Sequence, residues 1–187
     1  MPNITGLAEH FIYSNDDMYP TSPLTPDDFF AEDGRVRINM RSADFRQCKT
    51  QFRQVCLNSY RRVADGLGVT YNAYNYLRPM HGMAPMIKSH CLDCLNMLGE
   101  DILIYATAFR TEKQHNQYIY TDYECLKYTV APLLYPFRYL SFQLGSEYIA
   151  NTIRSRQYKV ICINDTKIPN RKKFKWQNIK NAFEDIL

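Results

Sequence analysis

The sequence predicts an α/β protein, made of an incomplete Rossmann-like core and a large helical insertion. Two apolar runs, residues 11–14 and 159–163, have the length and the β-branched or aromatic content of buried strands. Most apolar residues between these runs recur at helical spacing. We therefore predict one domain over residues 1–187, with its α/β core in residues 1–40 and 157–187 and the mainly helical insertion in residues 41–156.

The elements near the N-terminus follow from local signals. Residues 25–28, Thr-Pro-Asp-Asp, have the pattern of a helix N-terminus and predict a short helix that ends near Gly34. A brief strand is predicted over residues 36–38. Helical spacing of apolar residues then predicts the clearest helix of the chain over residues 44–64, which glycines terminate.

The rest of the insertion is predicted to be helical with two irregular stretches. Residues 69–84 read as an aromatic loop that carries His81, and residues 133–145 as irregular chain. The pattern of residues 101–109 is compatible with helix or strand, and we favour helix. Further helices are predicted over residues 85–98, 116–129, 146–156 and 174–187.

Both predicted core strands run directly into Asn and Asp. Residues 15–17 are Asn-Asp-Asp, and residues 164–165 are Asn-Asp. Ligands of open α/β sheets bind beyond the carboxyl ends of the strands, so we expect the two strands to be parallel neighbours. Asp16 and Asp165 would then lie within about 10 Å of each other, the span of a small phosphate and metal cluster. Asn and Asp are also common where a strand simply turns.

Composition excludes several classes of protein. The 187 residues carry a net charge of +4, which is too small for a nucleic-acid-binding protein and is compatible with an anionic ligand. No stretch reaches the roughly 20 apolar residues that span a bilayer, and a signal peptide is not recognisable at the N-terminus. We expect a cytoplasmic protein, compatible with peripheral association at the inner face of the plasma membrane.

The six cysteines are scattered, and most stand within apolar stripes, where cysteine behaves as a small hydrophobic residue. Cys91 and Cys94 form a Cys-x-x-Cys pair. Because there is no second pair, zinc binding or redox chemistry is a weak interpretation of these two residues.

Three stretches resemble signature blocks of the Stealth family, in family order. Residues 9–19, Glu-His-Phe-Ile-Tyr-Ser-Asn-Asp-Asp-Met-Tyr, closely resemble the second block. The third block is resembled by His81 with Pro85, Met86 and Lys88, then Phe109-Arg110, and then residues 116–118, Asn-Gln-Tyr. Residues 162–165, Cys-Ile-Asn-Asp, followed by residues 181–184, Asn-Ala-Phe-Glu, resemble the fourth. Stealth proteins are sugar-phosphate transferases of capsule and exopolysaccharide synthesis, related to the N-acetylglucosamine-1-phosphotransferase alpha/beta subunit.

The first family block has no counterpart in this sequence. We therefore expect the chain to be the C-terminal part of such a transferase, truncated at its N-terminus, with a sheet that lacks a strand. Its partners would then include the missing N-terminal segment or a second copy of the chain, because an open sheet edge promotes association.

The resemblance implies transfer of a hexose-1-phosphate from a nucleotide diphosphate sugar to a glycan hydroxyl, with release of a nucleoside monophosphate. Asp16, Asp17 and Asp165 would bind Mg²⁺ or Mn²⁺ that bridges phosphate oxygens. His81 would be the general base, and Arg110 would grip the transferred phosphate through its planar guanidinium. Further substrate contacts are assigned to Asn15, Asn164 and Lys88.

Other interpretations stay open. His81 could be an ordinary loop histidine in solvent, and Arg110 an ordinary surface arginine. The acid pair could serve a metal-dependent glycosyltransferase that moves only the sugar and releases a nucleoside diphosphate. The chain could also be an inactive fragment that serves as an acceptor-binding or assembly module.

Overall fold

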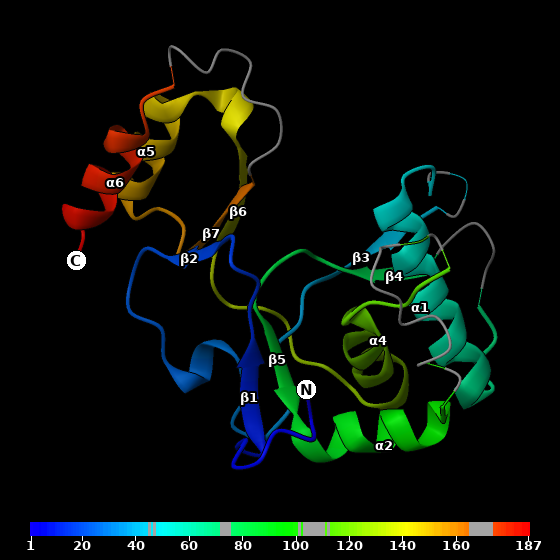
Figure 1. Cartoon of the computed structure of the whole chain (residues 1–187). Helices are drawn as coiled ribbons and strands as arrows, with labels where there is room; N and C mark the ends of the chain where they lie inside the picture. Colours follow the sequence, from blue (N-terminus) through cyan, green and yellow to red (C-terminus); the bar gives the residue numbers. More distant parts are fainter. Residues whose placement is uncertain are drawn as a thin grey trace. The chain divides into compact units, whose positions relative to one another are not determined.

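The computed structural model describes residues 1–187 except positions 45, 47, 72–75, 101, 103–110, 112 and 165–173. The chain forms two compact units, whose elements are labelled in Figure 1. The first unit comprises Met1–Tyr13, Phe29–Met80 and Ala84–Pro132, and the second comprises Ser14–Asp28, His81–Met83 and Leu133–Leu187. Residues 29–40 thus belong with the helical part, and residues 133–156 with the C-terminal part, unlike the predicted core and insertion boundaries.

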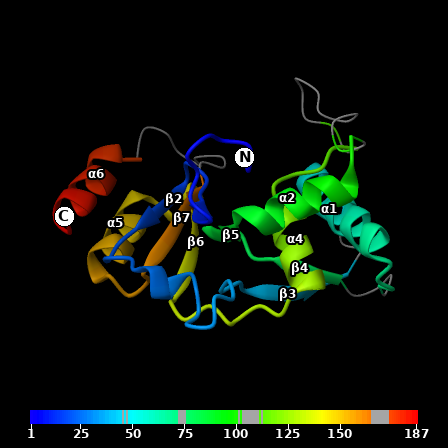
Figure 2. The same ribbon diagram turned by 90° about the horizontal axis from the view of Figure 1, so that it is seen from below.

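A three-stranded sheet organises the second unit. It contains β2 (Met18–Pro20), β7 (Val160–Asn164) and β6 (Phe137–Ser141), in that order. β6 and β7 are parallel, and the chain between them passes through the 3-10 turn η3 (Phe142–Leu144) and the helix α5 (Ser146–Ser155). This βαβ unit confirms the predicted α/β class. A second helix, α6 (Trp176–Glu184), lies beside α5 (Figure 2).

The strand β7 is buried along most of its length. Its first four residues are at most 7% exposed, as expected for a central strand that is covered on both faces. Side chains from β6, α5, β7 and α6 form one apolar cluster: Leu140, Phe142, Ile149, Ala150, Ile153, Ile161, Ile163, Ile179 and Ala182. The strand over residues 159–163 and the last two helices are therefore confirmed as elements.

In its described residues, the first unit combines two small antiparallel ladders with three helices. β1 (His10–Tyr13) pairs with β5 (Ala84–Ile87), and β3 (Met40–Ala43) pairs with β4 (Tyr76–Pro79). The helices are α1 (Gln51–Leu67), α2 (Lys88–Leu98) and α4 (Tyr118–Lys127). They enclose an apolar cluster of Val63, Cys94, Leu98, Ile119 and Tyr123.

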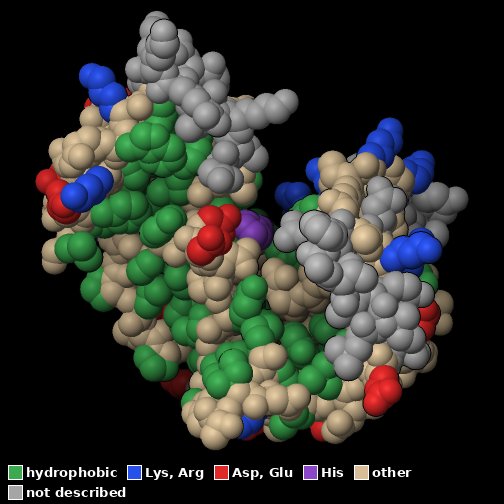
Figure 3. Space-filling model, viewed as in Figure 1, with side chains coloured by type: hydrophobic (Ala, Val, Ile, Leu, Met, Phe, Trp, Pro, Cys, Tyr) green, Lys and Arg blue, Asp and Glu red, His purple; other side chains and the backbone are tan. Residues whose placement is uncertain are grey.

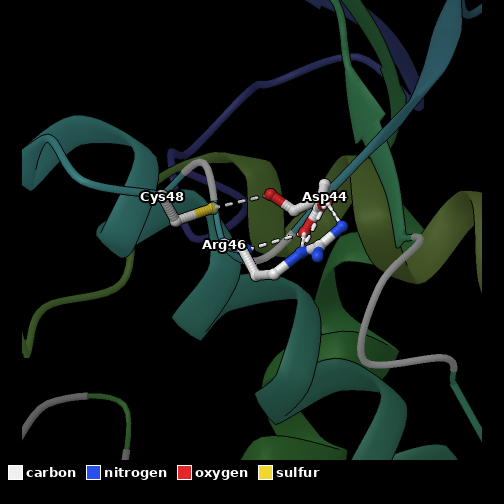
Figure 4. Close-up of polar contacts among 3 residues, drawn as sticks. All are labelled: Asp44, Arg46 and Cys48. Carbon is white, nitrogen blue, oxygen red and sulfur yellow. Dashed lines mark hydrogen bonds and ion pairs between the residues drawn. The ribbon is translucent and has the colours of Figure 1, made fainter.

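The helix α1 begins later than the sequence predicts. Asp44 accepts a hydrogen bond from the Arg46 backbone N–H at 2.8 Å, and the Cys48 thiol donates to the Asp44 carbonyl at 3.9 Å (Figure 4). Side-chain bonds of this kind compete with helical backbone bonds. The helix instead starts after Thr50, whose side chain accepts from the Arg53 N–H. It ends at Gly68, in the left-handed conformation.

The predicted adjacency of the first and last strands is wrong. β1 pairs with β5 in the first unit, whereas β7 pairs with β2 and β6 in the second. The reason lies in the turn between β1 and β2, where the Asn15 carbonyl accepts from the Met18 N–H at 3.3 Å. Through this turn β2, and not β1, becomes the neighbour of β7.

Four further predictions need correction. The predicted loop over residues 69–84 contains β4, and the predicted helix from residue 85 is preceded by β5. The stretch 133–145 contains β6 and η3. The predicted helix after residue 25 is only the 3-10 turn η1 (Pro26–Asp28). Residues 101–109 lie outside the described part of the chain except for Ile102.

Among the described helices, none has the length and apolar content to cross a membrane.

Candidate active site

The candidate site lies in the second unit, where β2 begins and β7 ends. Asp17 directly precedes β2, and its carbonyl accepts a hydrogen bond from the Ile163 N–H at 2.8 Å. β2 runs antiparallel to β7, so the residues before β2 lie at the carboxyl end of β7. This edge of a parallel β6 and β7 pair is where α/β proteins bind their ligands.

Two side chains of the second unit converge on one carboxylate oxygen of Asp17. The Asp17 Oδ2 lies 3.4 Å from the Nε2 of His81 and accepts a hydrogen bond from the Cys162 thiol at 3.2 Å. The Asp17 and His81 side chains are 22% and 26% exposed, whereas Cys162 is fully buried. The other carboxylate oxygen, Oδ1, is buried and has no hydrogen-bond partner among the described residues. Asp17 thus contacts His81 and Cys162 through Oδ2, while Oδ1 is the oxygen without a partner among the described residues.

The electrostatics of this cluster favour neutral hydrogen-bond donors around Asp17. Burial raises the pKa of the Cys162 thiol, and the adjacent Asp17 carboxylate raises that pKa further. Burial also raises the pKa of the Tyr139 phenol, with smaller contributions from Cys162 and Asp17. The Tyr139 ring meets the His81 ring edge to face, with 6.1 Å between their centroids. Both the thiol and the phenol are therefore protonated at neutral pH.

A cavity of about 570 Å³ opens beside Asp17. Its volume is in the range of small-molecule sites. Asn15, Asp16 and Asp17 supply its polar side. The remainder of the lining is mostly aromatic and aliphatic: Tyr19, Phe142, Ile163, Trp176, Ile179, Lys180 and Phe183. Figure 3 shows acidic and histidine side chains on one face of the molecule, with hydrophobic side chains gathered beside them.

The aromatic side of the cavity is built by packing within the second unit. The rings of Phe142 and Trp176 meet edge to face, with 4.7 Å between their centroids, and the ring centroids of Tyr19 and Phe183 are 5.2 Å apart. Trp176 keeps 55% of its surface exposed. The flat ring of a nucleobase, or the apolar C–H face of a sugar ring, can pack against such side chains while its polar groups face the carboxylates.

Short stretches of the chain match curated proteins. The capsular polysaccharide phosphotransferase WcwK of Streptococcus pneumoniae is 58% identical over 36 residues, which are 19% of this chain and 11% of that protein. The exopolysaccharide phosphotransferase cps2G of Lactiplantibacillus plantarum is 62% identical over 32 residues, 17% of this chain and 10% of that protein. The chain is similar to polysaccharide phosphotransferases. No family model matches it.

The similarity to polysaccharide phosphotransferases is consistent with the Stealth-family resemblance. It includes the receptor polysaccharide phosphotransferase WefC of Streptococcus gordonii, 64% identical over 31 residues, 17% of this chain and 9% of that protein. Each match spans about a tenth of the relative's length, so the activity, substrates and partners of the whole protein are matters of proposal.

The structure places the predicted site residues in three groups. Asp17 contacts His81, and Asn15 and Asp16 line the adjoining cavity. Asn164 is the last residue of β7, opposite Ser141 of β6. Lys88 belongs to the first unit, where it begins α2 and its Nζ donates to the Leu7 carbonyl at 3.3 Å. Arg110 and Asp165 lie outside the described residues.

Sequence reasoning missed the contributions of Cys162, Tyr139 and Trp176. Cys162 was interpreted as a small hydrophobic residue, because it stands within an apolar strand. One signal was available, since residues 162 and 164 share a face of the strand by its two-residue period. For Tyr139 the signal was absent, because β6 itself was not predicted.

Proposed function

We propose that this protein is a polysaccharide phosphotransferase that transfers a hexose-1-phosphate from a nucleotide diphosphate sugar to a hydroxyl of a glycan. A nucleoside monophosphate would leave, and the product would be a capsular or exopolysaccharide phosphodiester. The observation that carries this proposal is the contact between Asp17 and His81 beside a cavity with an aromatic wall. The names of the similar proteins give the reaction class.

The base of the reaction is His81. An acceptor hydroxyl must lose a proton as its oxygen attacks the phosphorus that carries the sugar. With the Nε2–H donating to Asp17, the His81 Nδ1 has the lone pair that takes this proton. The Asp17 carboxylate then stabilises the imidazolium, and the edge of Tyr139 limits rotation of the ring. The separation of 3.4 Å is typical of catalytic contacts that tighten with substrate.

The residues beside the cavity fit the divalent cation that the family resemblance implies. Mg²⁺ takes oxygen ligands, commonly one or two carboxylates together with substrate phosphates and water. The Oδ1 of Asp17 is buried without a hydrogen-bond partner among the described residues, and the Asp16 carboxylate lines the same cavity. We infer that Asp16 and Asp17 hold the cation together with Asp165. The bound cation would supply charge neutralisation at the phosphoryl oxygens.

Recognition of the donor is assigned to the rest of the cavity. The aromatic faces of Tyr19 and Trp176 suit the sugar or the base of the donor. Asn15 and Asn164 would hydrogen-bond its hydroxyl groups, and Arg110 would hold the transferred phosphate through its bidentate guanidinium. Lys88 is kept as a further substrate-binding candidate.

The test is a kinetic comparison of two histidine variants in the protein as its gene encodes it. We expect His81→Ala to lower turnover about 10² to 10⁴-fold, because a general base contributes that factor, while affinity for the donor stays nearly unchanged. His10→Ala is the matched control, since His10 is exposed and belongs to the first unit. Turnover of the His81 variant within about threefold of the parent protein would remove His81 as the base.

A further inference from the structure

The Asp17 cluster offers a second set of ligands, besides the oxygens that suit Mg²⁺. A carboxylate oxygen of Asp17, an imidazole nitrogen of His81 and the sulfur of Cys162 all lie within 4.8 Å of one another. Two of the three separations are 3.4 Å and 3.2 Å. Around a tetrahedral zinc ion, with bonds of about 2.0 to 2.3 Å, neighbouring ligand atoms are about 3.3 to 3.8 Å apart. A movement of about 1 Å closes the third separation to that range.

The ligand types select a soft cation. Mg²⁺ and Ca²⁺ prefer oxygen, whereas thiolate and imidazole suit zinc and its neighbours in the transition series. Three protein ligands with one position left for water is the arrangement of reactive zinc sites. The thiolate of Cys162 and the carboxylate of Asp17 together balance the charge of a divalent ion.

The backbone holds these ligands in place without the ion. Cys162 is in the central strand of the sheet, opposite Met18 of β2. Asp17 is tied to the same strand through the Ile163 N–H. His81 joins them from the segment His81–Met83, which belongs to the same compact unit. Little reorganisation is therefore needed for binding.

We propose that Asp17, His81 and Cys162 form a binding site for a zinc-type divalent cation, whose occupation blocks the transferase site. The cation binds the Cys162 sulfur as the S–H proton leaves to solvent. The imidazole proton moves from Nε2 to Nδ1, so that the His81 Nε2 can give its lone pair to the cation. One Asp17 oxygen is the third protein ligand, and water fills the fourth position. The inhibition rests on the proposed function, because His81 can no longer serve as the base when it binds the cation. Binding of the cation itself does not depend on the proposed function.

Other cysteines give the matched control. Cys94 is fully buried in the first unit and its thiol donates to the Ile119 carbonyl at 3.7 Å. Within the described ranges, Asp17, His81 and Cys162 are the one group of three such side chains at ligand distances. Loss of Cys94 should therefore leave cation binding unchanged, although it stands in the Cys-x-x-Cys pair.

The experiment is a titration of the purified, metal-free protein with Co²⁺, which reports thiolate ligation by a charge-transfer absorption band. We expect one Co²⁺ per chain, a proton released on binding, and displacement of Co²⁺ by Zn²⁺ in the presence of excess Mg²⁺. Cys162→Ser should abolish the charge-transfer band. His81→Ala should weaken Co²⁺ binding about tenfold or more, but the band should remain because the Cys162 thiolate is still a ligand. Cys94→Ser should bind as the parent protein does.

Two results would overturn the site. One is a parent protein that shows no thiolate band with Co²⁺, and the other is a Cys162→Ser variant that retains it. If Cys162→Ser fails to fold, judged by circular dichroism, the parent titration and the His81→Ala comparison still decide. A protein that binds Zn²⁺ and yet transfers no sugar phosphate without it would reject the proposed function and leave the cation site standing.

Discussion

The two carboxylate oxygens of Asp17 have different surroundings. Oδ2 contacts His81 and Cys162, while Oδ1 has no hydrogen-bond partner among the described residues and is the oxygen that we propose for the cation. The sequence could identify Asp17 and His81 as candidates through the resemblance of their surroundings. It could not predict the contact between Cys162 and Asp17, because that contact depends on the pairing of β2 with β7, which local patterns do not reveal.

Asp122 is the residue whose ionisation should matter most for stability. It is 1% exposed on α4, and neither carboxylate oxygen has a hydrogen-bond partner among the described residues. Burial raises its pKa well above the ordinary carboxyl range. The folded state thus holds this proton more tightly than the unfolded state, so stability falls as pH rises above about 3.9, the unfolded pKa.

We therefore expect Asp122→Asn to raise the free energy of unfolding at pH 7 by about 1 to 3 kcal/mol and to change it little at pH 4. Urea unfolding at the two pH values measures this. Asp65→Asn, at an exposed position of α1, is the control and should have no such pH dependence. A loss of stability at pH 7 in the Asp122 variant would show that the carboxylate is needed in its charged form.

The helices and strands differ in how clearly the sequence predicts them. β7 was predicted from its continuous apolar run, and the helices α1, α5 and α6 from their helical pattern and end signals. β5 was missed because Pro85 reads as the first residue of a helix. In the structure Pro85 stands opposite Ile12, in a strand whose described sheet has one partner, where proline is tolerated. Short two-stranded ladders leave too few residues for such a pattern.

The end of α1 depends on one glycine conformation. Gly68 has φ +65°, and its N–H bonds to the carbonyls of Ala64 and Asp65. A Cβ added there would meet nothing within 4 Å, so the cost of Gly68→Ala is conformational alone. We expect a loss of about 1 kcal/mol in thermal or urea unfolding, and a smaller loss for Gly68→Asn, since asparagine tolerates this conformation. Equal losses in both variants would reject the explanation.

At the scale of the whole molecule, the second unit is assembled from three separate segments of the chain. Composition and strand patterns were sufficient to predict the α/β class. They were not sufficient to predict which strands pair, because β2 and β7 come from opposite ends of the sequence. Loop closure over such distances is decided by the packed sheet and not by any local signal.

Removal of β2 should therefore disrupt the second unit. A protein without its first twenty residues loses β2 and Asp17 together with β1, so β7 in the second unit and β5 in the first both lose a paired strand and expose unpaired backbone groups. We expect it to self-associate in size-exclusion chromatography and to lose a cooperative unfolding transition. A protein without its first five residues, which precede β1, should behave as the parent does. A monodisperse, cooperatively unfolding protein after the longer truncation would contradict this role of β2.

The products of the reaction test the central claim most directly. The protein as its gene encodes it would be incubated with Mg²⁺, a glycan acceptor, and a nucleotide diphosphate sugar labelled at the phosphorus next to the sugar. A site in which His81 activates a hydroxyl toward that phosphorus predicts that the label appears in the glycan and a nucleoside monophosphate is released. Both signals should fall together in His81→Ala. Release of a labelled nucleoside diphosphate, with no label in the glycan, would contradict the proposed sugar-phosphate transfer.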